Sequence, residues 1–309
     1  MWPLHRNLHL PLLAALALGQ ACAAQAFDLQ GHRGARGTAP ENTLAGFAAA
    51  LALGVDTLEL DTGVTRDGVV VIHHDRRLNP DIARGPDGRW IEAPGPLLRE
   101  LDFKALRRYD VGRLRPGSEY AARFPEQAPA DGARIPRLAE LFALVRKAGN
   151  DEVRFNIETK ISPAAPAETL PPEAFARALV GEIRKAGVAA RATVQSFDWR
   201  TLHAVERAAP EIATVYLTGR RRGGSQPQAV HAAGGRIWSP HYEELDTAAL
   251  IEARALELKV LPWTVNEPGF IERFLDLGVD GIITDYPERV RAELARRGMA
   301  LPAPTPVEP

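Results

Sequence analysis

Acidic and imidazole side chains that could do chemistry gather within one stretch of the chain, residues 55–75. Glu59 and Asp61 stand near the end of an apolar segment, and His73 and His74 close the apolar segment that follows. Carboxylate oxygens are the ligands that hard cations such as Ca²⁺ and Mg²⁺ prefer, and an imidazole can transfer protons near neutral pH. The stretch therefore predicts a divalent-cation site beside an acid-base group.

A β-hairpin is expected to bring these groups together. The Asp-Gly dipeptide at 67–68, between two apolar segments, is typical of a two-residue type I′ turn. That turn would set Asp61 directly opposite His74, and opposite residues project from the same face of a sheet. Side chains two apart on one strand also share a face. Glu59, Asp61 and His74 are therefore predicted to converge, with His73 on the other face as a bystander.

Further polar side chains follow other predicted strands. His32 and Arg33 follow the first strand, and Glu158 and Lys160 end the strand predicted over 153–159. With Glu59 and Asp61, this places three carboxylates at one end of the fold. Buried like charges need compensation, and two explanations remain open: a bound cation, or a salt-bridge network with the two basic residues.

Composition excludes some partners. The chain has 309 residues, is 45% hydrophobic and 25% charged, and carries 38 basic against 39 acidic residues for a net charge of -1. This balance is typical of a globular protein and gives no bulk field that would attract nucleic acid or an anionic membrane. We expect a small-molecule partner, no nucleic acid and no stable membrane anchor. The composition does not specify an oligomeric state.

The first segment, residues 1–26, is predicted to be a secretory signal peptide. It has Arg6 near its start, then an apolar run and small residues that suit cleavage after Ala23 or Ala26. A buried N-terminal helix and a lipid anchor on Cys22, the only cysteine, are the alternatives. The mature chain would then lack cysteine and need no disulfide. The expected location is periplasmic or secreted.

Strands and helices alternate along the rest of the chain, residues 27–300. The eight predicted strands begin at Phe27, Val55, Val153, Ala192, Ile212, Gly235, Lys259 and Asp280. Eight such units predict a (β/α)₈ TIM barrel, whose active site lies at the carboxyl ends of its strands. An open doubly wound sheet is the alternative, but no Gly-x-Gly-x-x-Gly follows any strand. Asn42 is predicted to cap the helix over 43–53.

Two segments depart from this alternation. Residues 69–74 are predicted to form an extra strand above the barrel, which completes a β-hairpin outgrowth after the second strand. The segment from about 76 to 135 is rich in Pro and Gly and is predicted to be a loop-rich insert over one side of the site. Residues 301–309 carry four prolines and are predicted to be disordered or extended.

Seven motifs, in order, resemble those of the glycerophosphodiester phosphodiesterase family. They are HRGARGTAPENT at 32–43, the pair Glu59 and Asp61, VVVIHHD at 69–75, NIETK at 156–160, QSFDW at 195–199, PWTVN at 262–266 and GIITDYP at 281–287. The resemblance covers residues 27–297 and implies a barrel enzyme that hydrolyses glycerophosphodiesters to sn-glycerol 3-phosphate and an alcohol.

The resemblance also implies roles for the site residues. It implies one divalent cation, Ca²⁺ or Mg²⁺, held by Glu59, Asp61 and Glu158. It further implies that His32 and His74 form the acid-base pair and that Arg33 and Lys160 contact phosphate. The sequence does not assign the acid and the base, nor whether water or the substrate hydroxyl attacks.

The chain departs from the family after the pair His74 and Asp75, where members often carry Leu followed by Arg-Thr-Thr and this chain has Arg-Arg-Leu-Asn-Pro. Phe197 and Trp263 are candidates to stack on the glycerol carbons. Residues 220–222 are interpreted as a solvated loop in preference to a phosphate clamp. Candidates for the leaving-group side are Trp90, Tyr109 and Tyr120. The alternative functions are a lysophospholipase D-like or other phosphodiesterase on the same barrel, and a non-catalytic glycerophosphodiester-binding protein.

Overall fold

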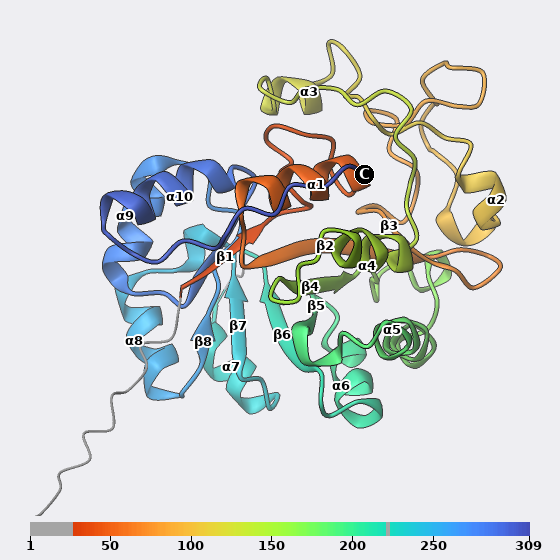
Figure 1. Ribbon diagram of the computed structural model, residues 1–309. Coiled ribbons are helices and arrows are strands. Elements are labelled where there is room, and N and C mark those ends of the chain that lie inside the picture. Colours follow the sequence, from red (N-terminus) through yellow and green to blue (C-terminus); the bar gives the residue numbers. More distant parts are fainter. Residues whose placement is uncertain (1–26, 221–222) are drawn as a thin grey trace, which may run out of the picture.

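The computed structural model describes residues 27–220 and 223–309, so the predicted signal peptide, Arg221 and Arg222 lie outside the described residues. Eight parallel strands form a nearly closed barrel with helices around it (Figure 1). The strands are β1 Asp28–Gly31, β2 Thr57–Val64, β4 Arg154–Thr159, β5 Ala192–Ser196, β6 Ala213–Thr218, β7 Ile237–Pro240, β8 Lys259–Val260 and β9 Gly281–Thr284. The prediction of a TIM barrel is confirmed.

The barrel closes between β8 and β9 through single hydrogen bonds. The strand predicted to begin at Lys259 ends after Val260, because Pro262 lacks the N–H that a ladder needs. The Asp280 amide still donates to the Val260 carbonyl at 3.1 Å, and the Ile283 amide donates to the Pro262 carbonyl at 3.1 Å. These bonds hold β9 against β8 and so close the barrel. Because the eight strands are parallel, their carboxyl ends face one mouth.

Helices cover the outside of the barrel. They are α1 Leu44–Leu53, α4 Leu138–Lys147, α5 Pro172–Ala186, α6 Trp199–Ala208, α7 Gln226–Ala232, α8 Thr247–Ala255, α9 Pro268–Leu277 and α10 Pro287–Arg296. Four short 3₁₀ helices are η1 Leu98–Glu100, η2 Pro166–Glu168, η3 Ala189–Arg191 and η4 Tyr242–Glu244.

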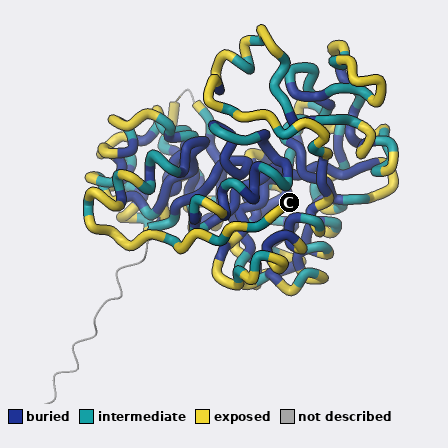
Figure 2. The backbone as a smooth tube through the Cα atoms, turned by 45° about the horizontal axis from the view of Figure 1, so that its top comes forward, coloured by how far each residue is buried: buried dark blue, intermediate teal, exposed yellow. Residues whose placement is uncertain are grey.

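The main core lies between strands and helices (Figure 2). Leu58, Leu60 and Ile157 are fully buried in it, and the ring of Phe155 packs edge-on against Phe142 of α4 at 4.9 Å between centroids. Successive side chains on a strand point to opposite faces. The residues between these apolar ones therefore point into the barrel, as predicted.

The extra strand β3, Val70–Ile72, pairs antiparallel with β2 but in a different register from the predicted one. Val64 lies opposite Val70, and the Thr65 amide donates to the Val69 carbonyl at 3.0 Å. This pair closes a loop of three residues, 66–68, with Gly68 at φ 81°. A three-residue hairpin loop with a left-handed glycine replaces the predicted two-residue turn. The register is shifted by one residue.

This shift corrects the predicted pairing of the histidines. His73, not His74, lies opposite Asp61, and its amide donates to the Asp61 carbonyl at 3.0 Å. A shift by one residue exchanges the two faces of a strand. The ladder therefore does not explain the position of His74, which comes after β3 has ended.

The predicted cap of α1 was also wrong. The hydroxyl of Thr43 accepts from the Gly46 amide at 3.0 Å and caps the helix. Asn42 has φ 54°, in the left-handed region, and its side chain turns toward Asp61 instead. Backbone held in this region is common at functional sites.

The insert contains the short helices α2 Phe103–Leu106 and α3 Glu119–Arg123 and lies to one side of the barrel (Figure 1). Its segments share a second, smaller core formed by Val71, Leu78, Ala83, Leu98, Leu106, Val111 and Ile135. This core anchors the insert to β3. Within the described residues, no helix is long and apolar enough to cross a membrane.

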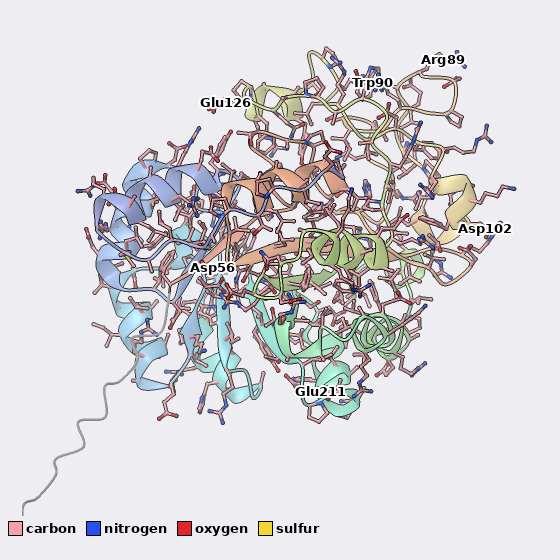
Figure 3. The ribbon with its side chains drawn as sticks, in the orientation of Figure 1. Asp56, Arg89, Trp90, Asp102, Glu126 and Glu211 are labelled. Carbon is pink, nitrogen blue, oxygen red and sulfur yellow. The ribbon has the colours of Figure 1, made fainter. Side chains whose placement is uncertain are left out.

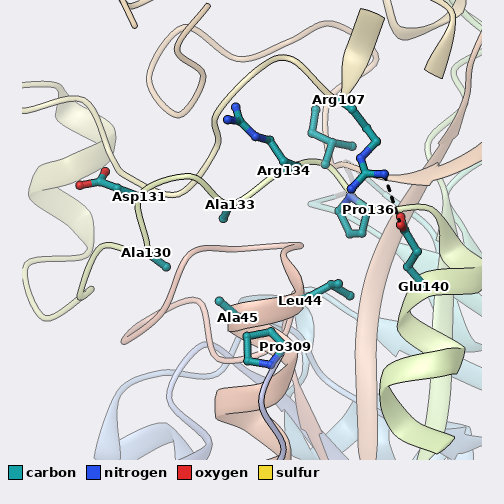
Figure 4. Close-up of a pocket in the computed structure, with 11 residues that line it drawn as sticks. Leu44, Ala45, Arg107, Ala130, Asp131, Ala133, Arg134, Pro136, Glu140 and Pro309 are labelled. Atoms are coloured by element: carbon teal, nitrogen blue, oxygen red, sulfur yellow. Dashed lines mark ion pairs between the residues drawn. The ribbon is translucent and has the colours of Figure 1, made fainter. Parts of the chain in front are cut away.

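The C-terminal segment, residues 301–309, runs extended along α1 and α4. The Thr305 amide donates to the Leu51 carbonyl at 2.7 Å, and Lys147 Nζ donates to the Glu308 carbonyl at 2.8 Å. Pro309 ends beside Ala45, at a cavity of about 330 Å³ between α1 and the insert (Figure 4). The extended form, not disorder, describes this tail.

Candidate active site

Three carboxylates meet inside the mouth of the barrel. Glu59 and Asp61 point inward from β2, and Glu158 points inward from the neighbouring strand β4. One oxygen from each lies within 4.8 Å of the others, and all three residues are buried. The structure therefore brings together the three acids that the sequence proposed as metal ligands.

Hydrogen bonds hold these acids in place but leave one oxygen free. Glu59 accepts from the Arg33 amide at 2.9 Å and from Gln195 Nε2 at 2.6 Å. Asp61 Oδ2 accepts from Asn42 Nδ2 at 2.8 Å. Asp61 Oδ1 is buried and has no hydrogen-bond partner among the described residues. A buried acceptor without a partner is costly and suggests a missing ligand.

The charges of the three acids also favour a bound cation. Burial, with Asp61 and Glu158 nearby, raises the pKa of Glu59 well above its ordinary value. Burial also raises the pKa of Glu158 to about 7, although Lys160 opposes this shift. Burial acts on Asp61 too, but the charges of Arg33, His74 and Lys160 together outweigh it, and the pKa of Asp61 lies well below its ordinary value. A divalent cation would compensate the charge, so the acids fit a hard cation such as Ca²⁺ or Mg²⁺.

His32 lies beside this cluster at the end of β1. Its Nδ1 is 2.7 Å from Asp285 Oδ1, and its Nε2 is 3.9 Å from Glu59 Oε2. Burial lowers the pKa of His32 to about 4, with Arg36 as the next cause. Arg36 Nη2 lies 3.1 Å from the same Nδ1. The hydrogen bond to Asp285 forms when Nδ1 carries the proton and donates it. Nε2 is then left as an acceptor that faces the acids.

His74 lies at the rim, half-buried, with Nδ1 2.8 Å from Asp75 Oδ1. Burial and the charge of Arg33 lower its pKa. After burial and Arg33, His74 is the next largest influence on the pKa of Asp61. His74 therefore acts on the same acids as His32, from the side of the insert.

Arg33 and Lys160 bring positive charge to the cluster. Arg33 Nη1 donates to Glu41 Oε1 at 2.9 Å, and its Nε lies 3.1 Å from Asp61 Oδ2. Lys160 Nζ donates to Glu158 Oε1 at 2.8 Å and lies 3.6 Å from Asp61 Oδ1. These ion pairs realise the predicted salt-bridge network in part, yet Asp61 Oδ1 still lacks a hydrogen bond.

The two aromatic candidates form one wall of the mouth. The rings of Phe197 and Trp263 meet edge-on at 5.3 Å between centroids, and Phe197 is 44% exposed. Trp263 also meets His241 edge-on at 5.2 Å. An exposed ring at the mouth of a barrel is available to a ligand. Arg220, from the predicted solvated loop, pairs with Glu243 on the surface.

Several residues of this site were missed by sequence reasoning. They are Arg36, Glu41, Asn42, Gln195, Asn266 and Asp285. Asp285 directly follows β9, so the rule that active-site residues follow barrel strands could have found it. Arg36, Glu41 and Asn42 lie in the loop that follows β1, within the motif at 32–43, so the same rule could have found them.

Tyr120 of the insert reaches the same loop. Its hydroxyl donates to Glu41 and lies 3.2 Å from Arg36 Nη1 and 3.5 Å from Arg33 Nη1. Burial raises the pKa of Tyr120, with Glu41 as the next cause. Trp90 and Tyr109 lie in other parts of the insert. The guanidinium carbon of Arg84 lies 5.7 Å from the centroid of the Trp90 ring.

Comparison with known proteins assigns the family. The pattern of the glycerophosphoryl diester phosphodiesterase family matches residues 32–289. The chain is 29% identical to a glycerophosphodiester phosphodiesterase of Caldanaerobacter subterraneus subsp. tengcongensis over 269 residues, covering 86% of this chain and 97% of that protein. It is also 29% identical to a glycerophosphodiester phosphodiesterase of Bacillus subtilis, with 83% of each chain covered.

Solved structures agree on the fold. A Silicibacter pomeroyi protein assigned to the glycerophosphoryl diester phosphodiesterases aligns with a TM-score of 0.84 and 38% identity, covering 90% of this chain and 96% of that one. An Oleispira antarctica phosphodiesterase, solved with the product sn-glycerol-3-phosphate, aligns with a TM-score of 0.68 and 23% identity, covering 87% of this chain and 96% of that one. The second likeness shows the fold alone.

Fold and site together define an enzyme of the phosphodiesterase TIM-barrel class. The chain belongs to the glycerophosphoryl diester phosphodiesterase family, as its motifs predicted.

Proposed function

We propose that this glycerophosphodiester phosphodiesterase hydrolyses its substrates to sn-glycerol 3-phosphate and an alcohol, with one divalent cation, Ca²⁺ or Mg²⁺, held by Glu59, Asp61 and Glu158. The observation that carries the proposal is the meeting of these buried carboxylates within 4.8 Å. When bound, such a cation polarises a phosphate oxygen as a Lewis acid. The proposed product is the molecule found in the Oleispira antarctica structure.

Arg33 and Lys160 orient the phosphate. Arg33 is buried and Lys160 is partly exposed, and both are tied to the acids by ion pairs, Arg33 Nε to Asp61 at 3.1 Å and Lys160 Nζ to Glu158 at 2.8 Å. Fixed positive charges in a buried site stabilise negative charge that develops on phosphate oxygens. Phe197 and Trp263 supply an apolar wall for the glycerol carbons.

His32 serves as the general base. Asp285 holds the proton on Nδ1, so Nε2 carries the lone pair that accepts a proton from the attacking oxygen. The pKa of about 4 keeps this ring neutral near neutral pH, as a base requires. The attacking oxygen belongs either to water or to the 2-hydroxyl of the substrate.

His74 serves as the general acid. It lies at the rim and lines a cavity together with Lys160 and residues of the insert. Burial and the nearby Arg33 lower its pKa in the free protein, and the negative charge of a bound phosphate would favour the protonated ring. His74 then donates its proton to the oxygen of the departing alcohol.

The Glu59→Gln variant tests this proposal. It keeps the shape of the side chain but removes one ligand charge, so kcat/KM for glycerophosphocholine should fall at least about a hundredfold. The matched control is Glu211→Gln, an exposed acid near α6 on the far side of the barrel (Figure 3), which should keep full activity. Full activity of Glu59→Gln would refute the proposal.

The proposal extends to location. We propose that the chain is secreted or periplasmic, because residues 1–26 have the pattern of a signal peptide and residues 27–309 contain no cysteine. N-terminal sequencing of the protein purified from culture medium or periplasm should find a start at Ala24 or Phe27. A start at Met1 would contradict the proposal.

A further inference from the structure

A cavity of about 370 Å³ opens beside His74 and Lys160, over the loops that follow β3 and β4. This volume lies within the range of about 300–1,000 Å³ that is usual for small-molecule sites. Its other lining residues are Asp75, Arg76, Arg77 and Glu168. Under the proposed function, His74 protonates the departing alcohol. The cavity therefore lies where the head group of that alcohol would leave.

Two arginines share one carboxylate on the wall of this cavity. Arg76 Nε donates to Glu168 Oε2 at 2.8 Å, and Arg77 Nε donates to Glu168 Oε1 at 3.2 Å. Arg77 also donates through Nη1 to the Gly95 carbonyl at 3.2 Å. Within the part of the chain that the structure describes, the Nη atoms of Arg76 make no hydrogen bond. A guanidinium has five N–H donors, so several remain for a ligand.

Acceptors stand beside these donors. Asp75 Oδ1 pairs with His74, and Asp75 Oδ2 accepts from Asn79 Nδ2 at 3.0 Å. A carboxylate can accept about four hydrogen bonds, so Asp75 and Glu168 both keep capacity. The lining pairs three cationic side chains with two carboxylates and an imidazole and contains no Phe, Tyr, Trp or aliphatic side chain.

This wall suits hydroxyl groups. A hydroxyl donates one hydrogen bond and accepts two, so a head group with several hydroxyls can use arginine donors and carboxylate acceptors together. A quaternary ammonium has no N–H and is bound chiefly over aromatic faces. The lining offers no such face, and its arginines would repel the cation.

We propose that this cavity binds the departing head group and selects polyhydroxylated alcohols, such as glycerol and inositol, over choline. The inference rests on the proposed function. It concerns Arg76 and Arg77, which stand in the segment where the chain departs from the family pattern.

The test compares kcat/KM for glycerophosphoglycerol, glycerophosphoinositol and glycerophosphocholine. The wild-type enzyme should prefer the two polyol substrates. Arg76→Ala should lower their values about tenfold more than the choline value, because a charged hydrogen bond is lost. Arg76→Lys keeps the charge but not the planar fork, so it should give a smaller loss in the same direction. It also serves as the test if the alanine variant does not fold.

The matched control is Arg89→Ala. Arg89 is an exposed arginine of the insert, paired only with Asp87 at 2.7 Å (Figure 3), and its loss should change none of the three values. The inference is overturned if the wild-type enzyme prefers the choline ester, or if Arg76→Ala lowers all three values equally. Failure of the proposed function would look different, because none of the three diesters would be hydrolysed.

Discussion

Asp285 lies against Nδ1 of His32, the proposed general base. It accepts from His32 Nδ1 at 2.7 Å and is itself held by Arg36 and by Asn266, which donates to Asp285 Oδ2 at 2.7 Å. A carboxylate fixed on both sides cannot rotate away. Asp285 is therefore a positioning residue for His32.

We predict that Asp285→Asn lowers kcat by about 10²–10⁴-fold, the usual contribution of acid-base catalysis, and leaves KM nearly unchanged. An amide can present its NH₂ group to Nδ1 and stabilise the wrong tautomer. Steady-state kinetics with glycerophosphocholine measure kcat and KM separately. Asp102→Asn, at an exposed ion pair of the insert, is the control. A rise in KM at constant kcat would contradict the assigned role.

Single residues show what the sequence could predict. Glu59, Asp61 and Glu158 were found because strand alternation and the barrel rule place them by local pattern. His32 and Asp285 are 253 residues apart, and no local pattern joins them. Asn42 was misassigned as a helix cap because asparagine suits both a cap and a left-handed backbone.

The insert reaches the active site through α3 and the residues after it, where Gln127 Nε2 donates to the Arg36 carbonyl at 2.8 Å. The hydroxyl of Tyr120 contacts Glu41, Arg33 and Arg36. These residues come from the loop after β1, so Tyr120 links the insert to the side of the site where Arg33 is proposed to bind phosphate. The insert was predicted to cover one side of the site, and Tyr120 is one point at which the insert contacts it.

We predict that Tyr120→Phe lowers kcat/KM at least about tenfold, because hydrogen bonds to charged groups contribute about 1.5–3 kcal/mol. Tyr109→Phe is the matched control, since Tyr109 packs against the small core of the insert and no side-chain hydrogen bond from it is found among the described residues. Circular dichroism should show both variants folded. Equal activity of the two variants would contradict a role in catalysis for the contact that Tyr120 makes.

The hairpin shows where element-level prediction failed. The hairpin was predicted correctly from two apolar segments and a glycine turn. The register of its strand pairing depends on the length of the loop, which was predicted wrongly. Gly68, at φ 81°, allows a three-residue loop as well as a two-residue one. The sequence around 66–68 does not separate these loops, so the position of His74 required the structure.

For the whole molecule, the acid cluster links stability to pH. Burial raises the pKa of Glu158 from 4.5 to about 7 in the folded chain. Between these values the folded state holds a proton that the unfolded state releases. The free energy of unfolding of the metal-free protein should therefore fall as pH rises from about 4.5 to about 7. A cation must displace this proton, so it should bind more tightly above pH 7.

Calorimetric titration of chelator-treated protein with Ca²⁺ and with Mg²⁺, at about pH 8 and about pH 5.5, tests the central claim most directly. We predict one cation per chain for at least one of the two metals, weaker binding at the lower pH, and no such site in Glu59→Gln. The same cation should restore release of glycerol 3-phosphate from glycerophosphocholine. Full hydrolysis by the chelated protein, or equal binding by Glu59→Gln, would contradict the claim that Glu59, Asp61 and Glu158 hold the catalytic cation.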